Sequence, residues 1–195
     1  PVEVVQRGLP GQEELGARLI TAQCEDLSFT TVYCPNGKDV NHEDFPRKLG
    51  WYEGLIEHWR NAHDAEEPAI ICGDFNVVPQ HVDSWLGAAG DGSVFHTEAE
   101  RSRFHRMLDL GLVDLFRYRN PDEQKFSWWD YRRGAFHRGQ GLRIDLLLAT
   151  RSVVERTETV GIDRDYRKKQ EGLTASDHAP VIASLRGVGA WLRSA

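Results

Sequence analysis

The sequence predicts an α/β or α+β fold with layered sheets, because strand-like segments outnumber helical ones and a helix stands between two strands. The apolar run at 69–72, rich in Ile and Cys, is typical of a fully buried strand. Apolar residues recur at helical spacing over 44–63. A strand, this helix and the next strand form a βαβ-like unit, which implies parallel strands and a right-handed crossover.

The N-terminal part begins with strands. Residues 2–5 alternate as a strand does, and 17–24 and 29–34 read as a hairpin. The helix at 44–63 follows, with Pro46 in its first turn. These elements precede the buried strand and build its side of the sheet.

The second half of the chain alternates shorter elements with loops. A basic, Gly-containing loop spans 132–141, and a charged connector spans 164–172. We expect one domain over residues 1–186 and a tail over 187–195. The remaining predicted elements are a short helix at 82–86, a helix after a capping box at 97–100, an aromatic strand at 126–131, and strands at 142–149, 153–163 and 179–185.

Composition limits the possible partners. The 195 residues include 24 basic and 30 acidic side chains, a net charge of −6, so any nucleic-acid contact must come from a local basic patch. Cys24, Cys34 and Cys72 are far apart in strand-like runs, and we interpret them as buried thiols in a reducing compartment, the cytoplasm. No apolar run is long enough to span a membrane, and no secretory signal is present.

Asp74 and Asn76 follow the buried strand one residue apart. Residues i and i+2 of a strand point the same way, so both side chains are expected to project together, with Phe75 turned into the core. A carboxylate beside a carboxamide can hold a hard cation, orient a water or donate to a developing oxyanion. The alternative is a strand end closed by an Asx-turn.

Asp145 interrupts an otherwise apolar strand, where a carboxylate is costly to bury without a partner. It forms either a structural ion pair, with Arg143 or a neighbouring strand, or an orienting contact to a histidine. Asp177 and His178 are adjacent and face opposite ways in an extended chain, so they serve different partners. His178 is a candidate base that meets Asp145, and Asp177 is a candidate for a metal.

Aromatic and cationic residues are mixed around 126–143. Trp128 stands near Arg132, Arg133 and Arg143, a combination that suits a phosphate backbone with a stacked or wedged base. A packed aromatic strand followed by a solvated loop is the alternative interpretation. Tyr33, before a turn, either donates to a phosphate or is merely packed.

Five motifs occur in a fixed order and carry a family resemblance. They are Tyr33-Cys34-Pro35-Asn36-Gly37, Gly73-Asp74-Phe75-Asn76, Phe126-Ser127-Trp128-Trp129-Asp130-Tyr131-Arg132, Gly141-Leu142-Arg143-Ile144-Asp145-Leu146-Leu147-Leu148 and Ser176-Asp177-His178-Ala179-Pro180. With them the chain resembles the exonuclease III group of AP endonucleases, within the endonuclease/exonuclease/phosphatase superfamily. The Gly-Asp-x-Asn and Ser-Asp-His motifs are shared across the superfamily, whereas the Trp-rich and Leu-Arg-Ile-Asp segments are closer to exonuclease III.

The resemblance implies a four-layered α/β sandwich of the DNase I-like type, with two facing mixed sheets, outer helices and a site where loops of both sheets converge. It also implies a Mg²⁺- or Mn²⁺-dependent DNA repair nuclease, a monomer that trims 3′ ends and cleaves double-stranded DNA 5′ to abasic sites. The alternatives are a superfamily phosphodiesterase acting on a non-nucleic-acid phosphate ester and a catalytically inactive DNA-binding fragment.

By matching position, the resemblance assigns catalytic roles. Tyr33 would contact the phosphate. Asp74 would orient or deprotonate the attacking water, or protonate the leaving group, and Asn76 would stabilise the transition state. Asp145 would hold His178, which contacts the scissile phosphate.

The resemblance also implies a metal site and a DNA surface. Asp74, Asn76, Asp177 and His178 would surround the metal. Trp128 would sit against the sugar at the lesion, with Arg132, Arg133 and Arg143 holding phosphates. The family's N-terminal segment supplies an early Asn and a metal-binding Glu, and no Glu before Tyr33 matches that context, so we expect a catalytic domain without its first strands.

Overall fold

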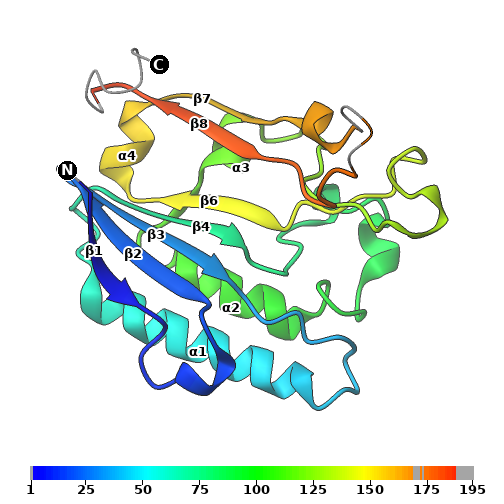
Figure 1. Cartoon of the computed structure of the whole chain (residues 1–195), viewed down its shortest axis with the longest axis horizontal. Coiled ribbons are helices and arrows are strands. Elements are labelled where there is room, and N and C mark those ends of the chain that lie inside the picture. The colour runs from blue at the N-terminus through cyan, green and yellow to red at the C-terminus, as the bar shows by residue number, and fades with distance from the viewer. Residues whose placement is uncertain (1, 169–171, 173, 188–195) are drawn as a thin grey trace.

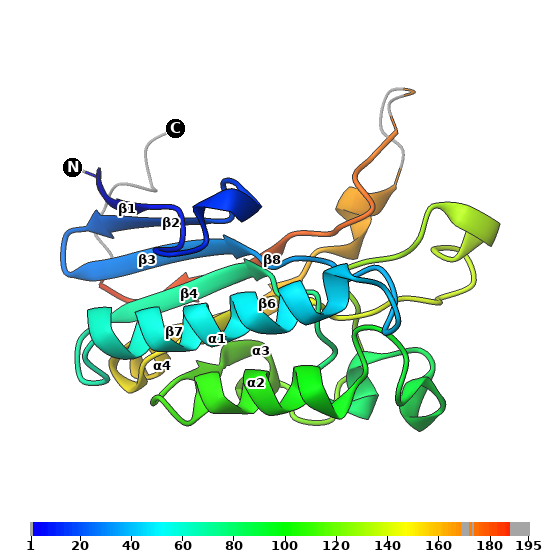
Figure 2. The ribbon, with the colours of Figure 1, turned by 90° about the horizontal axis from the view of Figure 1, so that it is seen from below.

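Two β-sheets lie face to face, and helices cover the outer face of the larger sheet (Figures 1 and 2). The computed structural model describes residues 2–168, 172 and 174–187. The strands are β1 (Val2–Arg7), β2 (Leu19–Cys24), β3 (Leu27–Tyr33), β4 (Ala69–Asp74), β5 (Val113–Asp114), β6 (Asp145–Ala149), β7 (Thr157–Ile162) and β8 (Val181–Leu185). The α-helices are α1 (Asp44–Ala62), α2 (Glu98–Leu108), α3 (Leu115–Arg119) and α4 (Arg151–Arg156).

The larger sheet is mixed, with the strand order β1-β2-β3-β4-β6-β5. Strands β3 and β4 are parallel and are joined by α1, as the βαβ pattern predicts, and all other neighbours in this sheet are antiparallel. The smaller sheet pairs β7 with β8 antiparallel. The α/β class, the mixed sheet and the facing sheets agree with the sequence-based expectation.

The strand β4 is apolar throughout because both of its faces are covered. Ile71 packs with α1 and α2, in a cluster that contains Trp51, Tyr52 and Leu55. Ile70 faces the other way and packs with residues of β6, β7, β8 and α4. This alternation explains why the run at 69–72 carries no polar residue.

Two predicted strands are wrong or shortened near the start of β6. Residues 126–131 make no strand: Trp128 forms isolated bridges to Leu142 and to His178, two different segments, so no continuous ladder arises. The strand predicted at 142–149 starts only at Asp145, because Leu142 is held by Ser84 and Trp128 and the Arg143 side chain enters a buried ion-pair network.

Three more boundaries differ from the prediction. The helix at 82–86 is replaced by two 3₁₀ turns, His81–Asp83 and Gly87–Gly90, because Asp83 at the end of the first one is drawn into buried ion pairs. The strand at 153–163 is divided into α4 and β7. The pair of short elements β5 and α3 was not predicted, since β5 has only two residues and Asp114 ends it by capping α3.

Several other expectations fit the structure. Thr97 and Glu100 form the capping box of α2, and Cys24, Cys34 and Cys72 are free thiols, although only Cys34 is fully buried and the other two are half-buried. In the described part of the chain, no helix is both long and apolar enough to cross a membrane. Most of the predicted tail, residues 188–195, and part of the connector at 164–172 lie outside the described residues.

Candidate active site

Three polar side chains stand in one row where β3, β4 and β6 meet, at the right-hand end of the larger sheet in Figure 1. Tyr33 is the register partner of Asp74 on the parallel strand, and Asp74 is the partner of Asp145 on the antiparallel strand. Directly paired residues project from the same face of a sheet. The register therefore brings these three predicted site residues to the same edge.

Asp145 and His178 form a hydrogen-bonded pair between the two sheets. His178 Nδ1 lies 2.9 and 3.0 Å from the two Asp145 carboxylate oxygens. A carboxylate only accepts, so Nδ1 carries the proton and Nε2 is left for the site. Burial by itself would lower the pKa of His178, but the Asp145 hydrogen bond and charge outweigh it, and the pKa is raised. Of the two interpretations of Asp145, the orienting contact is correct.

Asp74 and Asn76 also meet, through a turn rather than an extended strand. Asn76 has a φ of 48°, and its amide Nδ2 donates to Asp74 Oδ2 at 2.9 Å and to the Cys34 carbonyl at 2.9 Å. The Asn76 backbone N–H donates to Asp74 Oδ1 at 2.9 Å, so the Asx-turn is present as well. Phe75 is fully buried in the core, as expected.

Gly73 is required immediately before Asp74. It has a φ of 126°, and a Cβ there would collide with the carbonyl oxygen of Val32 on the neighbouring strand. Only glycine fits such a position without strain. The Gly-Asp pair of the motif therefore serves the close approach of β3 and β4 at the point where Asp74 faces the site.

The Asp74 carboxyl is poised for proton transfer near neutral pH. Burial, together with the negative charge of Asp145, raises its pKa from 3.8 to about 7. A group with this pKa can both take and give a proton at physiological pH. A hollow of about 400 Å³, partly lined by Gly73, Asp145 and His178, opens beside these groups.

Trp128 and Asp177 are joined by a hydrogen bond. Trp128 Nε1 donates to Asp177 Oδ2 at 3.0 Å, and Trp128 also bridges the backbone of His178. Asp177 and His178 thus serve different partners, as their opposite directions predicted. The half-buried Trp128 is thus held against the segment that carries Asp177 and His178.

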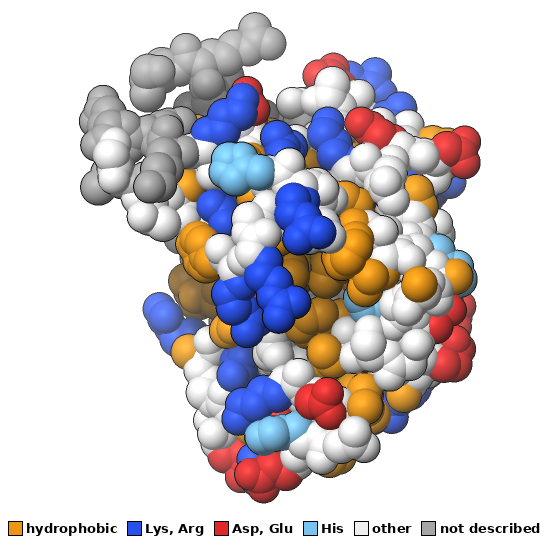
Figure 3. All heavy atoms as spheres, turned by 90° about the vertical axis from the view of Figure 1, so that its right-hand side faces the viewer, with side chains coloured by type: hydrophobic (Ala, Val, Ile, Leu, Met, Phe, Trp, Pro, Cys, Tyr) orange, Lys and Arg blue, Asp and Glu red, His pale blue; other side chains and the backbone are white. Residues whose placement is uncertain are grey.

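The predicted DNA contacts Arg132 and Arg133 lie in an exposed 3₁₀ turn on the protruding loop at the site end. Arg132 is 85% exposed at its side chain and pairs with Asp130. Figure 3 shows Lys and Arg side chains gathered on this face around a hollowed, partly apolar centre. A net-acidic protein thus presents a local basic surface where the sequence required one.

The prediction that Arg143 contacts a DNA phosphate is wrong. Its side chain is fully buried and donates to both carboxylate oxygens of Asp83 and to both of Asp114, at 2.6 to 3.1 Å. Burial would lower its pKa, but the two carboxylates raise it, so the guanidinium stays charged. The pairing of Arg143 with Asp145 considered from the sequence is likewise absent, because Asp145 is bonded to His178.

The predicted metal ligands do not converge as one protein cage. The Asp177 carboxylate accepts from Trp128, and His178 Nδ1 is bonded to Asp145. Among the described residues, no group of three or more His, Cys, Asp or Glu side chains is arranged to hold a metal. The carboxylate and amide oxygens of Asp74, Asn76 and Asp177 are of the ligand type that hard cations such as Mg²⁺ take, and Mg²⁺ needs few protein ligands because it keeps several waters.

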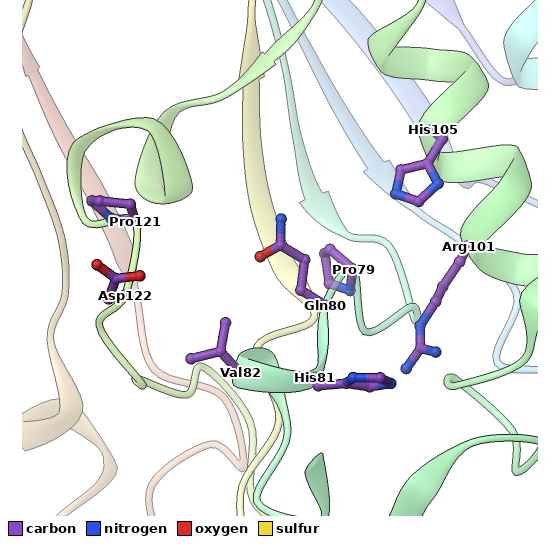
Figure 4. A pocket seen from close by; sticks show the side chains of 8 residues that line it. All are labelled: Pro79, Gln80, His81, Val82, Arg101, His105, Pro121 and Asp122. Carbon is purple, nitrogen blue, oxygen red and sulfur yellow. The ribbon is translucent and has the colours of Figure 1, made fainter. Parts of the chain in front are cut away.

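A separate hollow of about 570 Å³ lies away from these groups (Figure 4). It is bounded by α2, the turn at 79–82 and the loop after α3, and none of the predicted site residues lines it. Its lining residues are Pro79, Gln80, His81, Val82, Arg101, His105, Pro121 and Asp122.

Comparison with known proteins identifies the family. The profile of the Endonuclease/Exonuclease/phosphatase family matches residues 3–178. The chain belongs to this family. Exodeoxyribonuclease III of Haemophilus influenzae is 36% identical over 197 residues, which cover 94% of this chain and 73% of the relative.

Solved structures place the chain in the same group. An AP endonuclease from Archaeoglobus fulgidus has a TM-score of 0.88 at 31% identity, covering 95% of this chain and 72% of that one. A 3′ phosphatase from Neisseria bound to a product DNA hairpin has a TM-score of 0.86 at 30% identity, covering 94% and 70%. The chain is thus a member of the exonuclease III and AP endonuclease group of the family, whose exodeoxyribonucleases and AP endonucleases are hydrolytic phosphodiesterases.

Sequence reasoning gave no role to two residues that touch the site. Asn36 donates from Nδ2 to Asn76 Oδ1 at 3.4 Å, and Lys48 donates to the Asn76 carbonyl at 2.6 Å. Asn36 stands inside the first of the five motifs, but it is uncharged, and nothing in the sequence indicated a role for it. Lys48 did give one: it lies on the stripe of α1 that also carries Tyr52 and Leu55, where a charge requires a buried partner.

Proposed function

We propose that the protein is a DNA repair nuclease, a 3′–5′ exodeoxyribonuclease and AP endonuclease that hydrolyses the phosphodiester 5′ to abasic sites in double-stranded DNA. The observation that carries the proposal is the His178–Asp145 pair set opposite Asp74 and Asn76 at the edge where the two sheets meet. The names of the relatives, exodeoxyribonuclease III and AP endonuclease, support the choice of DNA as substrate.

The residues divide the chemistry of hydrolysis among them. A water oxygen attacks phosphorus, the bond from phosphorus to the leaving oxygen breaks, and negative charge builds on the phosphoryl oxygens. Asp74, with its pKa of about 7, orients and deprotonates the water or protonates the leaving oxygen. His178, kept protonated by Asp145, faces the developing charge, and Tyr33 donates to the phosphate. The Asn76 amide hydrogens are bonded to Asp74 and Cys34 in the free protein, so Asn76 stabilises the transition state by exchanging one of these acceptors for the phosphate.

The proposal includes a divalent cation, Mg²⁺ or Mn²⁺. Asp74, Asn76 and Asp177 would hold it, and when bound it would neutralise charge on the phosphate. His178 was also predicted as a ligand; its bond to Asp145 leaves Nε2 available, and we propose that Nε2 faces the phosphate.

Lesion choice is proposed to follow shape. A nucleotide without a base leaves the stack at a lower cost than an intact one. Trp128 would close over the exposed sugar, while Arg132 and Arg133 hold flanking phosphates without reading sequence. We also predict a cytoplasmic monomer, which size-exclusion chromatography and cell fractionation would check.

The test is cleavage of two matched duplexes, one with a single abasic site and one intact. Purified protein with Mg²⁺ is expected to cut the first 5′ to the lesion and to trim recessed 3′ ends, and EDTA is expected to stop both reactions. An abasic duplex that stays uncut in Mg²⁺ and in Mn²⁺ would overturn the proposal. Turnover of non-nucleic-acid phosphate esters under the same conditions would favour the phosphodiesterase alternative.

A further inference from the structure

A buried lysine lies directly behind the catalytic strand end. The Lys48 side chain has no exposed surface, and its Nζ donates to the Asn76 carbonyl at 2.6 Å and to the Asn36 carbonyl at 3.2 Å. Its third partner is the equally buried carboxylate of Glu100. Every donor direction of the ammonium is therefore used, and two of the three acceptors belong to loops that reach the active site.

The two carbonyls that Lys48 contacts belong to Asn36 and Asn76, and the Asn76 backbone has an uncommon conformation. Asn76 has a φ of 48°, in the left-handed region that non-glycine residues adopt only when their surroundings fix them. Its side chain must at the same time point at Asp74. Asn36 donates to the Asn76 amide oxygen, so the two asparagines form one polar unit above the ammonium.

Glu100 fixes the lysine to the rest of the fold. Its carboxylate also accepts from the backbone N–H of Phe95 and from both the N–H and the hydroxyl of Thr97, which caps α2. The Phe95 ring lies over Lys48 at 4.8 Å. The start of α2 is therefore fixed by several hydrogen bonds, and Lys48 connects it to the site.

The position of Lys48 is tightly specified from the other side as well. Gly37, with a φ of 84°, passes so near that a Cβ would lie 2.9 Å from Lys48 Cδ. The turn after Tyr33 is thus closed over the lysine stem. A replacement of Lys48 that keeps its volume but removes the charge would leave this packing in place and would free only the polar contacts.

We propose that Lys48 is a positioning residue for the nuclease reaction: it clamps the backbone of Asn76 and Asn36, so that the Asn76 amide is held against the Asp74 carboxylate in one fixed geometry. Lys48 does not reach the reacting atoms itself. The proposal rests on the proposed function for its kinetic test, and it makes a structural statement that can be tested without any substrate.

The decisive variant removes both charges of the pair. Replacing a buried ion pair with neutral groups of similar shape is often tolerated, whereas removing one partner leaves an unpaired charge. Lys48→Met/Glu100→Gln keeps the volume of the lysine and an acceptor oxygen for Phe95. Leu55→Ala is the matched control, because Leu55 is fully buried in the core on the same helix and its apolar side chain cannot hydrogen-bond the loops that Lys48 holds.

We expect the double variant to lower kcat on the abasic duplex by about 10²-fold, with KM within about twofold of the parent. Displacing a catalytic group by about 1 Å has an effect of this size. Leu55→Ala is expected to lower the melting temperature at least as much while kcat stays within about twofold. Equal loss of kcat in both variants, or a parental kcat in the folded double variant, would overturn the proposal.

A measurement without DNA separates this proposal from the proposed function. The side-chain NH₂ signals of Asn76 and Asn36, followed by nuclear magnetic resonance, are expected to shift and broaden in Lys48→Met/Glu100→Gln but not in Leu55→Ala. Unchanged Asn76 signals in the double variant would refute the clamp. If the parent protein cut no abasic duplex, the proposed function would fail, and these signals would still decide whether Lys48 positions the two amides.

Discussion

Arg143 and Asp145 stand two residues apart in one segment but lie in opposite electrostatic surroundings. Arg143 is fully buried and balanced, with bidentate contacts to Asp83 and Asp114. Asp145 is half-buried, and beside its single partner His178 it faces a second carboxylate, Asp74. In the first region each charge has an opposite partner, whereas in the second, burial together with the negative charge of Asp145 raises the pKa of Asp74 to about 7.

The difference separates what holds the fold from what acts on a substrate. A buried arginine between two aspartates holds the 3₁₀ turn at 81–83 against the strand β5. Facing carboxylates contribute nothing to stability, and such arrangements persist at sites where perturbed proton affinity is used. The comparison predicts that changes in the second region alter turnover and pH dependence, while changes in the first region alter stability alone.

A large loss of turnover is expected for Asp145→Asn. The amide cannot stabilise His178 as an imidazolium, so kcat should fall by about 10²–10⁴-fold, the range of general acid–base catalysis. Loss of the Asp145 charge also removes one cause of the raised pKa of Asp74, so the acid limb of the pH–rate profile should move to lower pH. Circular dichroism and the melting temperature should stay near parental values. A parental rate near pH 7 would reduce Asp145 to a structural role.

Arg143→Met is expected to act on stability instead. It leaves the buried Asp114 without its cationic partner and leaves Asp83 paired with Arg117 alone, which is expected to lower the free energy of unfolding by about 3–5 kcal/mol. The slope of DNA affinity against salt concentration should not change, because the guanidinium touches no solvent-facing surface. Urea denaturation and salt-dependent binding at a temperature where the variant is folded would check both parts. A flatter salt slope would return Arg143 to the DNA interface.

Local patterns indicated the residues that the structure brings together at the end of β3, β4 and β6. Asp74 and Asn76 were selected because a buried apolar strand ending in two polar residues is visible within a few neighbouring residues. The rule that a buried acid needs a partner left two interpretations of Asp145 open, an ion pair or a histidine, and the structure shows the histidine. In both cases the physical constraint acts on residues within one strand, or on a single unsatisfied charge, so the sequence contains it.

Partners distant in sequence explain the errors. Arg143 was placed at the DNA because it stands among aromatic and basic residues, and nothing local shows that Asp83 and Asp114 reach it. The aromatic strand failed for the same reason, since Trp128 bridges two different segments. Lys48 was overlooked although its place on an apolar helical stripe demanded a buried acceptor.

Asp74→Asn is expected to abolish cleavage while it stabilises the fold at alkaline pH. The folded pKa of about 7 lies above the ordinary 3.8, so the folded protein binds this proton more tightly than the unfolded chain. The contribution of Asp74 to stability therefore falls as pH rises from about 4 to 7 and stays low above that.

An asparagine removes this penalty but loses one hydrogen bond from the Asn76 amide. We expect a net gain of roughly 1–3 kcal/mol at pH 8, about 2–4 °C in melting temperature for each kcal/mol, and a smaller gain at pH 5. Thermal melts of variant and parent at the two pH values would measure it. A gain that does not depend on pH would mean that Asp74 is ionised in the fold throughout, and DNA affinity that falls with the rate would indicate a disturbed strand end.

The smallest effects are expected on the proposed DNA surface. There, changes at Trp128 should alter the preference for abasic DNA, whereas changes at Arg132 and Arg133 should alter affinity. Trp128→Ala removes the ring proposed to cover the sugar, so the ratio of cleavage rates on abasic and intact duplexes should fall about tenfold, while overall affinity changes less. Trp128→Phe is the matched variant: it keeps an aromatic ring but removes the Nε1 donor to Asp177. If the ring selects the lesion, Trp128→Phe keeps most of the preference, and if the hydrogen bond does, both variants lose it equally.

Arg132→Ala and Arg133→Ala should instead weaken binding to both duplexes alike. Each lost phosphate contact is expected to lower the magnitude of the slope of log affinity against log salt by about 1, without changing the abasic preference. The measurement is a set of binding curves for the two duplexes at several salt concentrations. Since Arg132 is paired with Asp130 in the free protein, its effect should be the smaller of the two. An abasic preference that fell with either arginine would place lesion recognition on the loop, and one that survived Trp128→Ala would assign Trp128 to packing.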